Sequence, residues 1–256
     1  MPELLAPLAP GSTIGIVGNG QLGRMSAIAA ARLGFRVHVF GPEADAPAAQ
    51  VAARATVASY DDEAALRAFA ASVDVVTFEF ENVSAAGLDL LEQRVAVRPG
   101  PAVLRTSQDR LAEKRFLEAA KVKVAPWAAV ETEAELVAAV QKLGLPAVLK
   151  TTRLGYDGKG QAKLLAQEDL APAFARLNPK PLVLEKFVDF ACEVSVVVAR
   201  GADGTVACFD TVENRHHDHI LHATFAPARI TPALAQAAQQ AAVKVANAIG
   251  LVGLLC

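Results

Sequence analysis

The chain has 256 residues, of which 53% are hydrophobic and 20% are charged. This composition provides enough apolar surface for a packed core and excludes a largely disordered protein. The formal net charge of -2 excludes a strongly basic surface for nucleic acid. No apolar run reaches the roughly 18 residues that a membrane span needs, and residues 1–10 lack the basic start of a secretory signal. We therefore expect a cytoplasmic protein whose partners include neither nucleic acid nor a membrane.

The first part of the chain alternates between strand and helix patterns. Strands are predicted at residues 13–17, 36–40 and 73–78, and helices at residues 21–33 and 62–71. Such alternation with short connections is typical of a parallel sheet covered on both faces. We therefore predict a Rossmann-like first domain over residues 1–98.

The pattern changes after Pro99-Gly-Pro101, and we place a second domain at residues 99–256. Helices are predicted at residues 109–119, 132–143, 167–177 and 231–249. Strands are predicted at residues 147–151, 161–165, 182–186, 193–200, 205–212 and 251–256. Gly201-Ala-Asp-Gly204 is typical of a hairpin turn between two of these strands, so antiparallel pairing is expected here.

The three cysteines, Cys192, Cys208 and Cys256, show no C-x-x-C spacing. Neither a disulfide framework nor a thiolate zinc cluster is therefore indicated. We expect these cysteines to be small buried hydrophobic residues.

The motif Gly18-Asn-Gly-Gln-Leu-Gly23 follows a predicted strand and opens a predicted helix. In this context backbone N–H groups and the helix dipole can hold a phosphate. A dinucleotide site also needs an acid at the tip of the second strand, where this chain has Phe40-Gly-Pro42, with Glu43 just beyond. Two interpretations stay open: a ligand-binding turn, including that of a nicotinamide-dependent oxidoreductase, or a turn whose glycines serve packing alone.

Two acids, Glu79 and Glu81, end the third predicted strand. Strand alternation would place both on one face, beside the crevice where open α/β sheets bind ligands. A solvated strand end is the alternative. We favour a binding site, because two acids directly after a buried run need water or a ligand with donors.

A glycine-containing loop, Gly155-Tyr-Asp-Gly-Lys-Gly-Gln161, follows a strand that ends at Lys150. Its amides and Lys159 can wrap the phosphates of a nucleotide, while Lys150 neutralises charge from the other side. The spacing is not that of a P-loop. The alternative is a mobile hairpin loop, which would not explain a lysine at the end of an apolar strand.

Four of the five histidines lie within residues 215–222. Imidazoles are common metal ligands, so a metal site is one interpretation. We favour a solvated loop with one functional member over a zinc site.

Taken together, these motifs resemble the ATP-grasp superfamily and, within it, the 5-(carboxyamino)imidazole ribonucleotide synthase family. The stretches that carry the resemblance are 18–25, 78–82, Asp109-Arg110 with Lys114, 125–127, 155–161, 192–195 and 213–216. The resemblance implies an α/β fold with a Rossmann-like pre-ATP-grasp domain followed by an α+β ATP-grasp domain.

The resemblance also implies a reaction in purine (IMP) biosynthesis. ATP and bicarbonate form a carboxyphosphate-like intermediate, whose carboxyl group is captured by the amine of 5-aminoimidazole ribonucleotide, with release of ADP and phosphate. Relatives of this kind are usually homodimers. The alternatives are another ATP-grasp carboxylase or ligase, and a binding module that holds nucleotide without turnover.

Site residues follow from the same resemblance. Tyr156 and Asp157 are expected to close over the reacting centre, and Asp157 to position the amine or bicarbonate. The 5-aminoimidazole ribonucleotide is expected to contact Gln21, Leu22, Glu79 and Glu81. ATP is expected to contact Arg110, Lys150, Gly155, Tyr156, Asp157, Gly158, Lys159, Gly160, Gln161, Glu185, Lys186, Phe187, Val188, Glu193 and His216.

One feature departs from the family pattern at residues 250–256. In the family this strand runs on into a glutamate, and a later Asn-Glu completes the magnesium site. We therefore expect the Mg²⁺ ligands and the small C-terminal domain beyond residue 256, an incomplete ATP-grasp domain, and no metal ligand within this chain.

Overall fold

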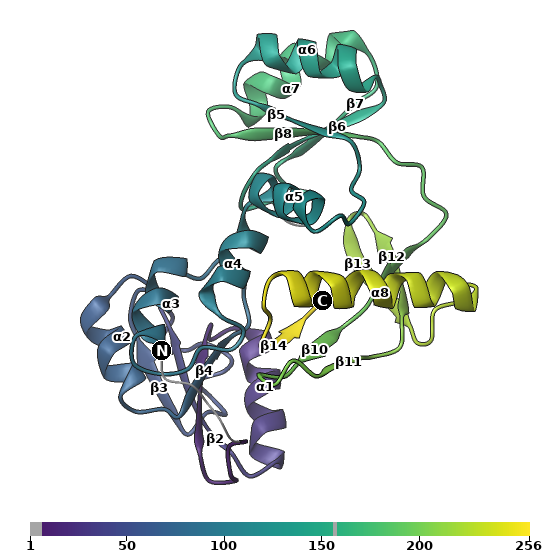
Figure 1. Cartoon of the computed structure of the whole chain (residues 1–256). Helices are drawn as coiled ribbons and strands as arrows, with labels where there is room; N and C mark the ends of the chain where they lie inside the picture. Colours follow the sequence, from purple (N-terminus) through teal and green to yellow (C-terminus); the bar gives the residue numbers. More distant parts are fainter. Residues whose placement is uncertain (1–6, 156–157) are drawn as a thin grey trace. The chain divides into compact units, whose positions relative to one another are not determined.

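The computed structural model describes residues 7–155 and 158–256 (Figure 1). The chain divides into two units, each of which combines segments that are distant in the sequence. The first unit contains the described part of Met1–Arg105 together with Ala199–Ala207 and Ile249–Leu255. The second contains the described part of Thr106–Val198 together with Cys208–Ala248 and Cys256.

A four-stranded parallel sheet of order β3-β2-β1-β4 forms the centre of the first unit. Its strands are β1 (Thr13–Val17), β2 (Arg36–Gly41), β3 (Arg54–Val57) and β4 (Val75–Phe78). The helices of this part are α1 (Gln21–Arg32), α2 (Glu63–Ala70), α3 (Ala85–Glu92) and α4 (Pro101–Gln108). The predicted parallel, Rossmann-like arrangement is confirmed, whereas β3, α3 and α4 were not predicted.

Both faces of this sheet are buried, as expected for a parallel sheet. On one face Phe40 packs against Phe69 with ring centroids 5.2 Å apart, and both side chains are fully buried. On the other face Ile16 and Val39 pack against Ala27 of α1. Alternate residues of each strand therefore pack into the cores on opposite faces of the sheet. This packing fixes the ends of β1 and β4 beside the glycine turn.

A small sheet of order β11-β10-β14 joins Val206–Cys208, Val198–Arg200 and Gly253–Leu255. The Gly201 amide donates to the Thr205 carbonyl at 2.8 Å, so the predicted hairpin turn is confirmed. The predicted single strand over residues 193–200 is wrong, because β9 (Glu193–Ser195) and β10 belong to different sheets. The chain changes sheets between Ser195 and Val198.

The second unit contains an antiparallel sheet of order β5-β8-β6-β7. Its strands are β5 (Trp127–Val130), β6 (Ala147–Thr151), β7 (Gln161–Leu164) and β8 (Leu182–Lys186). One face packs on α6 (Glu133–Leu143) and α7 (Leu170–Leu177), the latter preceded by the short 3₁₀ helix η1 (Gln167–Asp169). Figure 1 shows α5 (Arg110–Ala119) on the opposite face of this sheet.

Local sequence explains where these helices begin. Thr132 and Glu135 form a capping box at α6. The Thr132 hydroxyl accepts from the Glu135 amide, and the Glu135 carboxylate accepts from the Thr132 amide. Asp109 caps α5 by accepting from the amides of Leu111 and Ala112 at 2.9 and 3.0 Å. The cap places the first turn of α5 beside the end of β6.

The histidine-rich stretch lies on a hairpin, not in the solvated loop that we predicted. Strands β12 (Val212–His217) and β13 (Ile220–Phe225) pair with each other, and β12 also pairs with β9. Helix α8 (Pro232–Ala248) follows. The hairpin signal is weak in the sequence because its two turn residues, Asp218 and His219, include no glycine.

The cysteine prediction is also wrong: Cys192 and Cys256 are exposed and Cys208 is only partly buried. Cys192 precedes β9 and Cys256 follows β14, so neither cysteine lies within a strand or helix. Within residues 7–155 and 158–256, the helices include none that is both long and apolar enough to cross a membrane.

Candidate functional site

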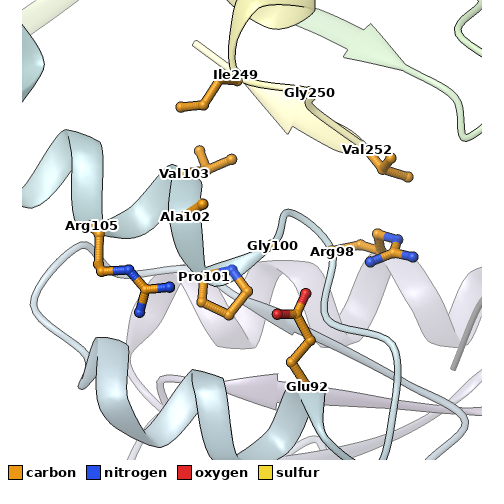
Figure 2. A pocket seen from close by; sticks show the side chains of 10 residues that line it. All are labelled: Glu92, Arg98, Gly100, Pro101, Ala102, Val103, Arg105, Ile249, Gly250 and Val252. Carbon is orange, nitrogen blue, oxygen red and sulfur yellow. The ribbon is translucent and has the colours of Figure 1, made fainter. Parts of the chain in front are cut away.

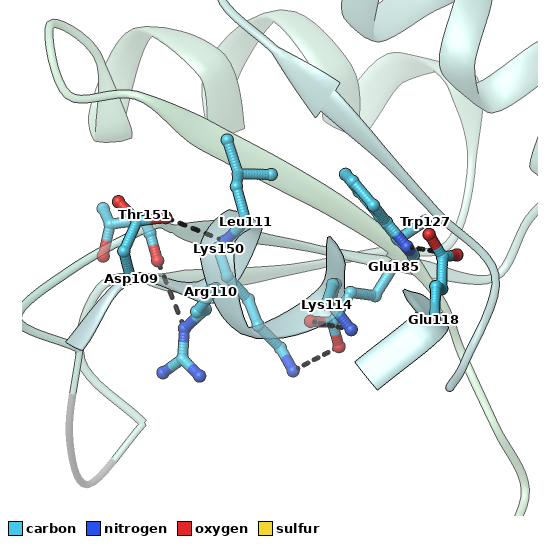
Figure 3. Close-up of polar contacts among 9 residues, drawn as sticks. All are labelled: Asp109, Arg110, Leu111, Lys114, Glu118, Trp127, Lys150, Thr151 and Glu185. Atoms are coloured by element: carbon cyan, nitrogen blue, oxygen red, sulfur yellow. Dashed lines mark hydrogen bonds and ion pairs between the residues drawn. The ribbon is translucent and has the colours of Figure 1, made fainter. Parts of the chain in front are cut away.

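The centre of the second unit's polar face is an acid held between two lysines (Figure 3). The carboxylate of Glu185 on β8 forms ion pairs with Lys150 Nζ at 2.7 Å and with Lys114 Nζ at 3.0 Å. Each amine contacts a different carboxylate oxygen. The three side chains are only 10 to 23% exposed. They come from three elements, β8, β6 and α5, so the network ties the helix to the sheet.

The charges in this network favour an anion. Burial acts to raise the pKa of Glu185, but hydrogen bonds and charge from Lys150 and Lys114 outweigh it, and the pKa is lowered overall. For the nearby Glu113, burial raises the pKa despite the charges of Arg110 and Lys114. Three cations thus face two acids, one of which resists ionisation. This surplus suits a phosphate group, which binds through charge-assisted hydrogen bonds.

Arg110 connects this network to the glycine-rich loop. Its Nε donates to the Thr151 carbonyl at 3.2 Å and its Nη2 to the Gly155 carbonyl at 3.3 Å. These two bonds fix the guanidinium where the loop leaves β6. The predicted ATP residues Arg110 and Gly155 are therefore in direct contact.

Thr151 anchors both ends of the loop and was not predicted from the sequence. The side chain is 2% exposed, and its hydroxyl donates to the Arg153 carbonyl at 3.0 Å. Its amide donates to the Gly160 carbonyl at 2.8 Å. Gly160 has φ 72°, and a methyl group there would lie 2.6 Å from Thr151 Oγ1. Only the close backbone approach reveals this role, and the sequence carries no spacing that signals it.

A cavity of about 530 Å³ adjoins the loop. It is lined by Arg110, Gly155, Gly158, Lys159, Gln161, Phe190, Glu193, His216 and His219. Seven of these were predicted to contact ATP, whereas Phe190 and His219 were not. Tyr156 and Asp157, predicted to be catalytic, lie outside the described residues.

His216 and Glu193 form a pair on one wall of this cavity. His216 Nδ1 lies 3.2 Å from Glu193 Oε1, across the paired strands β12 and β9. The neighbouring Glu213 is 8% exposed and is held by Arg229 at 3.0 and 3.1 Å. Hydrogen bonds from Arg229 lower the pKa of Glu213. This anchored acid fixes the strand that carries His216.

Six described residues that were predicted to contact ATP are absent from the cavity lining: Lys150, Gly160 and Glu185, described above, and Lys186, Phe187 and Val188. Lys186 reaches the Leu145 carbonyl at 3.3 Å on the helix-covered side of the sheet, because it is offset by one residue from Glu185. The Phe187 ring lies 4.2 Å from Lys163 Nζ, and Val188 is 48% exposed. Of Lys186, Phe187 and Val188, only Val188 is exposed.

In the first unit, Glu79 covers the glycine turn. Its carboxylate accepts from the amides of Gly20 and Gly23. A methyl group at Gly18, which has φ 112°, would lie 2.7 Å from Glu79 Oε1. The helix N-terminus that we expected to hold a phosphate is therefore already paired with an acid of the same chain.

Glu79 and its neighbour Glu81 are electrostatically coupled. Burial chiefly raises the pKa of Glu79, and the charge of Glu81 adds to this, while the two glycine amides act in the opposite direction. Strand β4 ends at Phe78, so the alternation we assumed for the two acids does not extend to them. Glu79 is half-buried and Glu81 exposed.

The structure disfavours a dinucleotide in this turn. Asn19 is 6% exposed, its Nδ2 donates to the Glu43 carbonyl at 2.8 Å, and its side chain fills the space where a side chain at Gly41 would lie. The tip of β2, where a ribose would bind, is thus occupied. The predicted substrate residues Gln21 and Leu22 begin α1 and are exposed.

A second cavity, of about 500 Å³, lies in the first unit (Figure 2). Figure 2 shows Ile249 and Val252 on one side, and Glu92 and Arg98 on the other. Arg98 donates to the Val97 carbonyl at 2.9 Å. The predicted substrate residues are absent from its lining, which comprises Glu92, Arg98, Gly100, Pro101, Ala102, Val103, Arg105, Ile249, Gly250 and Val252.

The donor groups needed for a resident metal ion do not converge in the described residues. Within 7–155 and 158–256, no three His, Cys, Asp or Glu side chains are grouped as metal ligands. The His216–Glu193 pair supplies two such groups. These residues do not fit a Mg²⁺ site by themselves.

Two protein-family models match the chain. The ribonucleotide synthetase preATP-grasp domain matches residues 11–108. The ATP-grasp domain matches residues 115–256. Together they cover both units of the fold.

Individual relatives match along nearly the whole chain. The N5-carboxyaminoimidazole ribonucleotide synthase of Brucella melitensis is 50% identical over 250 residues, which are 97% of this chain and 69% of that protein. The crystal structure of an ADP complex of N5-carboxyaminoimidazole ribonucleotide synthetase has a TM-score of 0.92 at 43% identity, covering 96% of this chain and 66% of the other.

A third relative, from Aspergillus clavatus, was crystallised with ADP and 5-aminoimidazole ribonucleotide. It has a TM-score of 0.88 at 31% identity and covers 96% of this chain and 65% of its own. The chain thus spans about two thirds of the length of these relatives.

Proposed function

Because the chain belongs to the N5-carboxyaminoimidazole ribonucleotide synthase family, we propose that it forms the nucleotide-binding part of an enzyme that carboxylates 5-aminoimidazole ribonucleotide. The family resemblance predicted from the sequence is confirmed, as is the predicted pre-ATP-grasp and ATP-grasp fold. The carboxylation activity of the whole protein is the part that we propose.

The proposed reaction proceeds in two steps. A bicarbonate oxygen attacks the γ-phosphorus of ATP, ADP leaves, and a carboxyphosphate forms. The amine nitrogen of 5-aminoimidazole ribonucleotide then attacks the carboxyl carbon, a C–N bond forms, the C–O bond to phosphate breaks, and the amine loses a proton. The products are the carbamate, ADP and phosphate.

The observation that carries this proposal is the Lys114–Glu185–Lys150 network beside the glycine-rich loop. Phosphoryl transfer depends on positioning and on positive charge near the phosphate oxygens. Lys150 is held by Glu185 at 2.7 Å, so its amine stays at the end of β6 instead of sampling many rotamers. Arg110, fixed by two backbone carbonyls, supplies a second oriented cation at the cavity wall.

The remaining roles are part of the same proposal. Lys150 and Lys159 face the phosphates of ATP. The segment from Glu185 to Val188 contacts the adenine. Glu193 contacts the ribose, and His216 lies beside Glu193. Glu79, Glu81, Gln21 and Leu22 contact the ribonucleotide. Tyr156 and Asp157 close over the reacting centre. A bound Mg²⁺ ion would neutralise phosphate charge. No residue of the chain is assigned to this ion. A homodimeric assembly and a cytoplasmic location complete the proposal.

Calorimetric titration with ATP tests the proposed nucleotide site directly. We expect the chain to bind ATP, and Lys150→Met to weaken binding by about tenfold or more, since it removes a charge-assisted contact. Lys142→Met, on the exposed side of α6, is the matched control and should bind ATP as the unsubstituted chain does. Binding that survives Lys150→Met unchanged would contradict the assignment, and tight NADH binding would favour the oxidoreductase alternative.

A further inference from the structure

The turn that joins β12 to β13 has an unusual residue for its backbone. Asp218 and His219 have φ of 50° and 66°, between the paired residues His217 and Ile220. A two-residue hairpin turn with both φ positive favours glycine at its second position. A histidine there is strained, since its Cβ crowds the backbone in the left-handed region. The turn by itself therefore gives no reason for a histidine.

The imidazole of His219 lies directly against the glycine-rich loop. A methyl group built on Gly158 would lie 2.7 Å from His219 Cδ2 and 3.1 Å from Cγ. Gly158 itself has φ 74°. Glycine is thus required at residue 158 both by its backbone conformation and by the ring that covers it.

Both residues line the cavity of about 530 Å³ that also contains Arg110, Lys159 and Glu193. The contact therefore joins the tip of one hairpin to a loop about 60 residues earlier in the chain, at the wall of the proposed ATP site. All of these residues belong to the second unit.

We propose that His219 is a positioning residue, whose ring supports Gly158 and holds the glycine-rich loop in its nucleotide-binding conformation. This inference rests on the proposed ATP site. Backbone strain at a turn tip persists where function requires the side chain. His219 would then favour ATP binding at the expense of turn stability, because a loop held in its bound conformation loses less entropy on binding.

His219→Gly and Asp218→Gly form a matched pair for the test. Both replace a residue of positive φ in the same turn by glycine, but only the first removes the ring. We expect both variants to unfold at the same or a higher urea concentration than the parent chain. We expect ATP to bind about five-fold more weakly to His219→Gly and equally well to Asp218→Gly. Unchanged ATP binding in His219→Gly, or an equal loss in both variants, would overturn the proposal.

A double-mutant cycle tests the contact without ATP. Gly158→Ala should destabilise the parent chain through both the strained φ and the clash with the ring, and should destabilise less in the His219→Gly background. An equal loss in both backgrounds would overturn the contact. Failure of the unsubstituted chain to bind ATP would instead count against the proposed function, and the cycle would still decide whether His219 supports Gly158.

Discussion

The amine of Lys150 donates to Oε2 of Glu185 at 2.7 Å across two antiparallel strands. The register pairs Lys150 with Val183 and Val148 with Glu185, so lysine and acid are diagonal neighbours on one face of the sheet. Lys114 reaches the other oxygen from α5. A single acid thus fixes two cations beside the proposed phosphate site.

Lys150→Met should lower stability as well as ATP affinity. It leaves Glu185, 13% exposed, with Lys114 as its remaining partner in the network, and we expect a loss of about 1 to 3 kcal/mol in the free energy of unfolding. The lowered pKa of Glu185 contributes stability above its unfolded pKa, and this is lost as the pH falls through the folded pKa. Without Lys150 the folded pKa of Glu185 should lie nearer its unfolded pKa, so the part of the acid-induced loss that Glu185 causes should be smaller. Urea unfolding from pH 7 to pH 3 measures both effects.

Lys142→Met is again the control for this variant, because its exposed position should leave both quantities unchanged. In Glu185→Gln, the further effect of Lys150→Met should shrink, since the two residues act through one interaction. Full additivity of the two substitutions would contradict the network.

Thr151→Val should loosen the glycine-rich loop, whereas Thr151→Ser should not. Valine keeps the shape but loses the hydroxyl that donates to the Arg153 carbonyl at 3.0 Å. We expect Val to cost about 1 kcal/mol of unfolding free energy and to weaken ATP binding, while Ser retains ATP affinity. Chemical denaturation and calorimetry check this, and equal ATP affinity in the Val and Ser variants would show that the hydroxyl has no part in shaping the site.

Glu79→Gln should separate stability from function. Burial and Glu81 raise the pKa of Glu79, so ionisation of Glu79 is less favourable in the folded protein than in the unfolded chain. The stability of the fold therefore falls as the pH rises past the unfolded pKa. The neutral glutamine should therefore leave stability at pH 7 unchanged or higher. Binding of 5-aminoimidazole ribonucleotide should weaken, and ATP binding should not change.

Glu43→Gln is the matched control, since the contact with Asn19 uses the Glu43 backbone carbonyl and not its side chain. Isothermal titration with each ligand separates the two effects. A loss of ATP affinity in Glu79→Gln, or an undiminished ribonucleotide affinity, would contradict the assignment of this turn to the ribonucleotide.

His38 should make the first unit sensitive to acid. Burial, and secondarily the charge of Arg54, lower its pKa to about 4. Ser72 Oγ donates to the Phe69 carbonyl, so it accepts from His38 Nδ1 at 2.9 Å, and Nε2 accepts from the Thr56 hydroxyl at 2.8 Å. The folded state therefore holds a neutral imidazole, and a second proton on Nε2 would displace the hydrogen bond from the Thr56 hydroxyl.

A depressed histidine pKa means that the unfolded chain binds more protons between pH 6.5 and about pH 4. Stability should be fully present above pH 6.5 and should fall by at most about 3 kcal/mol across this window. His38→Gln should flatten this slope, while His222→Gln, on the exposed strand β13, should keep it. An identical slope in His38→Gln would assign the acid sensitivity to other groups.

The sequence predicts the regular parts of the fold well. The strands at Thr13–Val17 and Ala147–Thr151 were predicted correctly, because their apolar runs are bounded by glycine or by charged residues. Strand β3 was missed because the edge strand Arg54–Val57 is short and largely exposed. The hairpin β12–β13 was missed because β12 is mostly polar and the turn lacks glycine.

The candidate site likewise contains residues that the sequence predicts and residues that it does not. Lys150 and the loop at residues 155–161 were predicted from the residue types that phosphate binding needs. The roles of Thr151 and His219 depend on backbone approach to Gly160 and Gly158, which no local pattern encodes. Glu79 was predicted as a site residue, but its hydrogen bonds to the Gly20 and Gly23 amides come only from the folded geometry.

The measurement that tests the central claim most directly is phosphate release from ATP by a purified protein that contains this chain. We predict release only when both bicarbonate and 5-aminoimidazole ribonucleotide are present, with one ADP formed for each carbamate, and abolition of release by Lys150→Met. Phosphate release that is independent of the ribonucleotide, or that responds equally to other amine acceptors, would contradict the account.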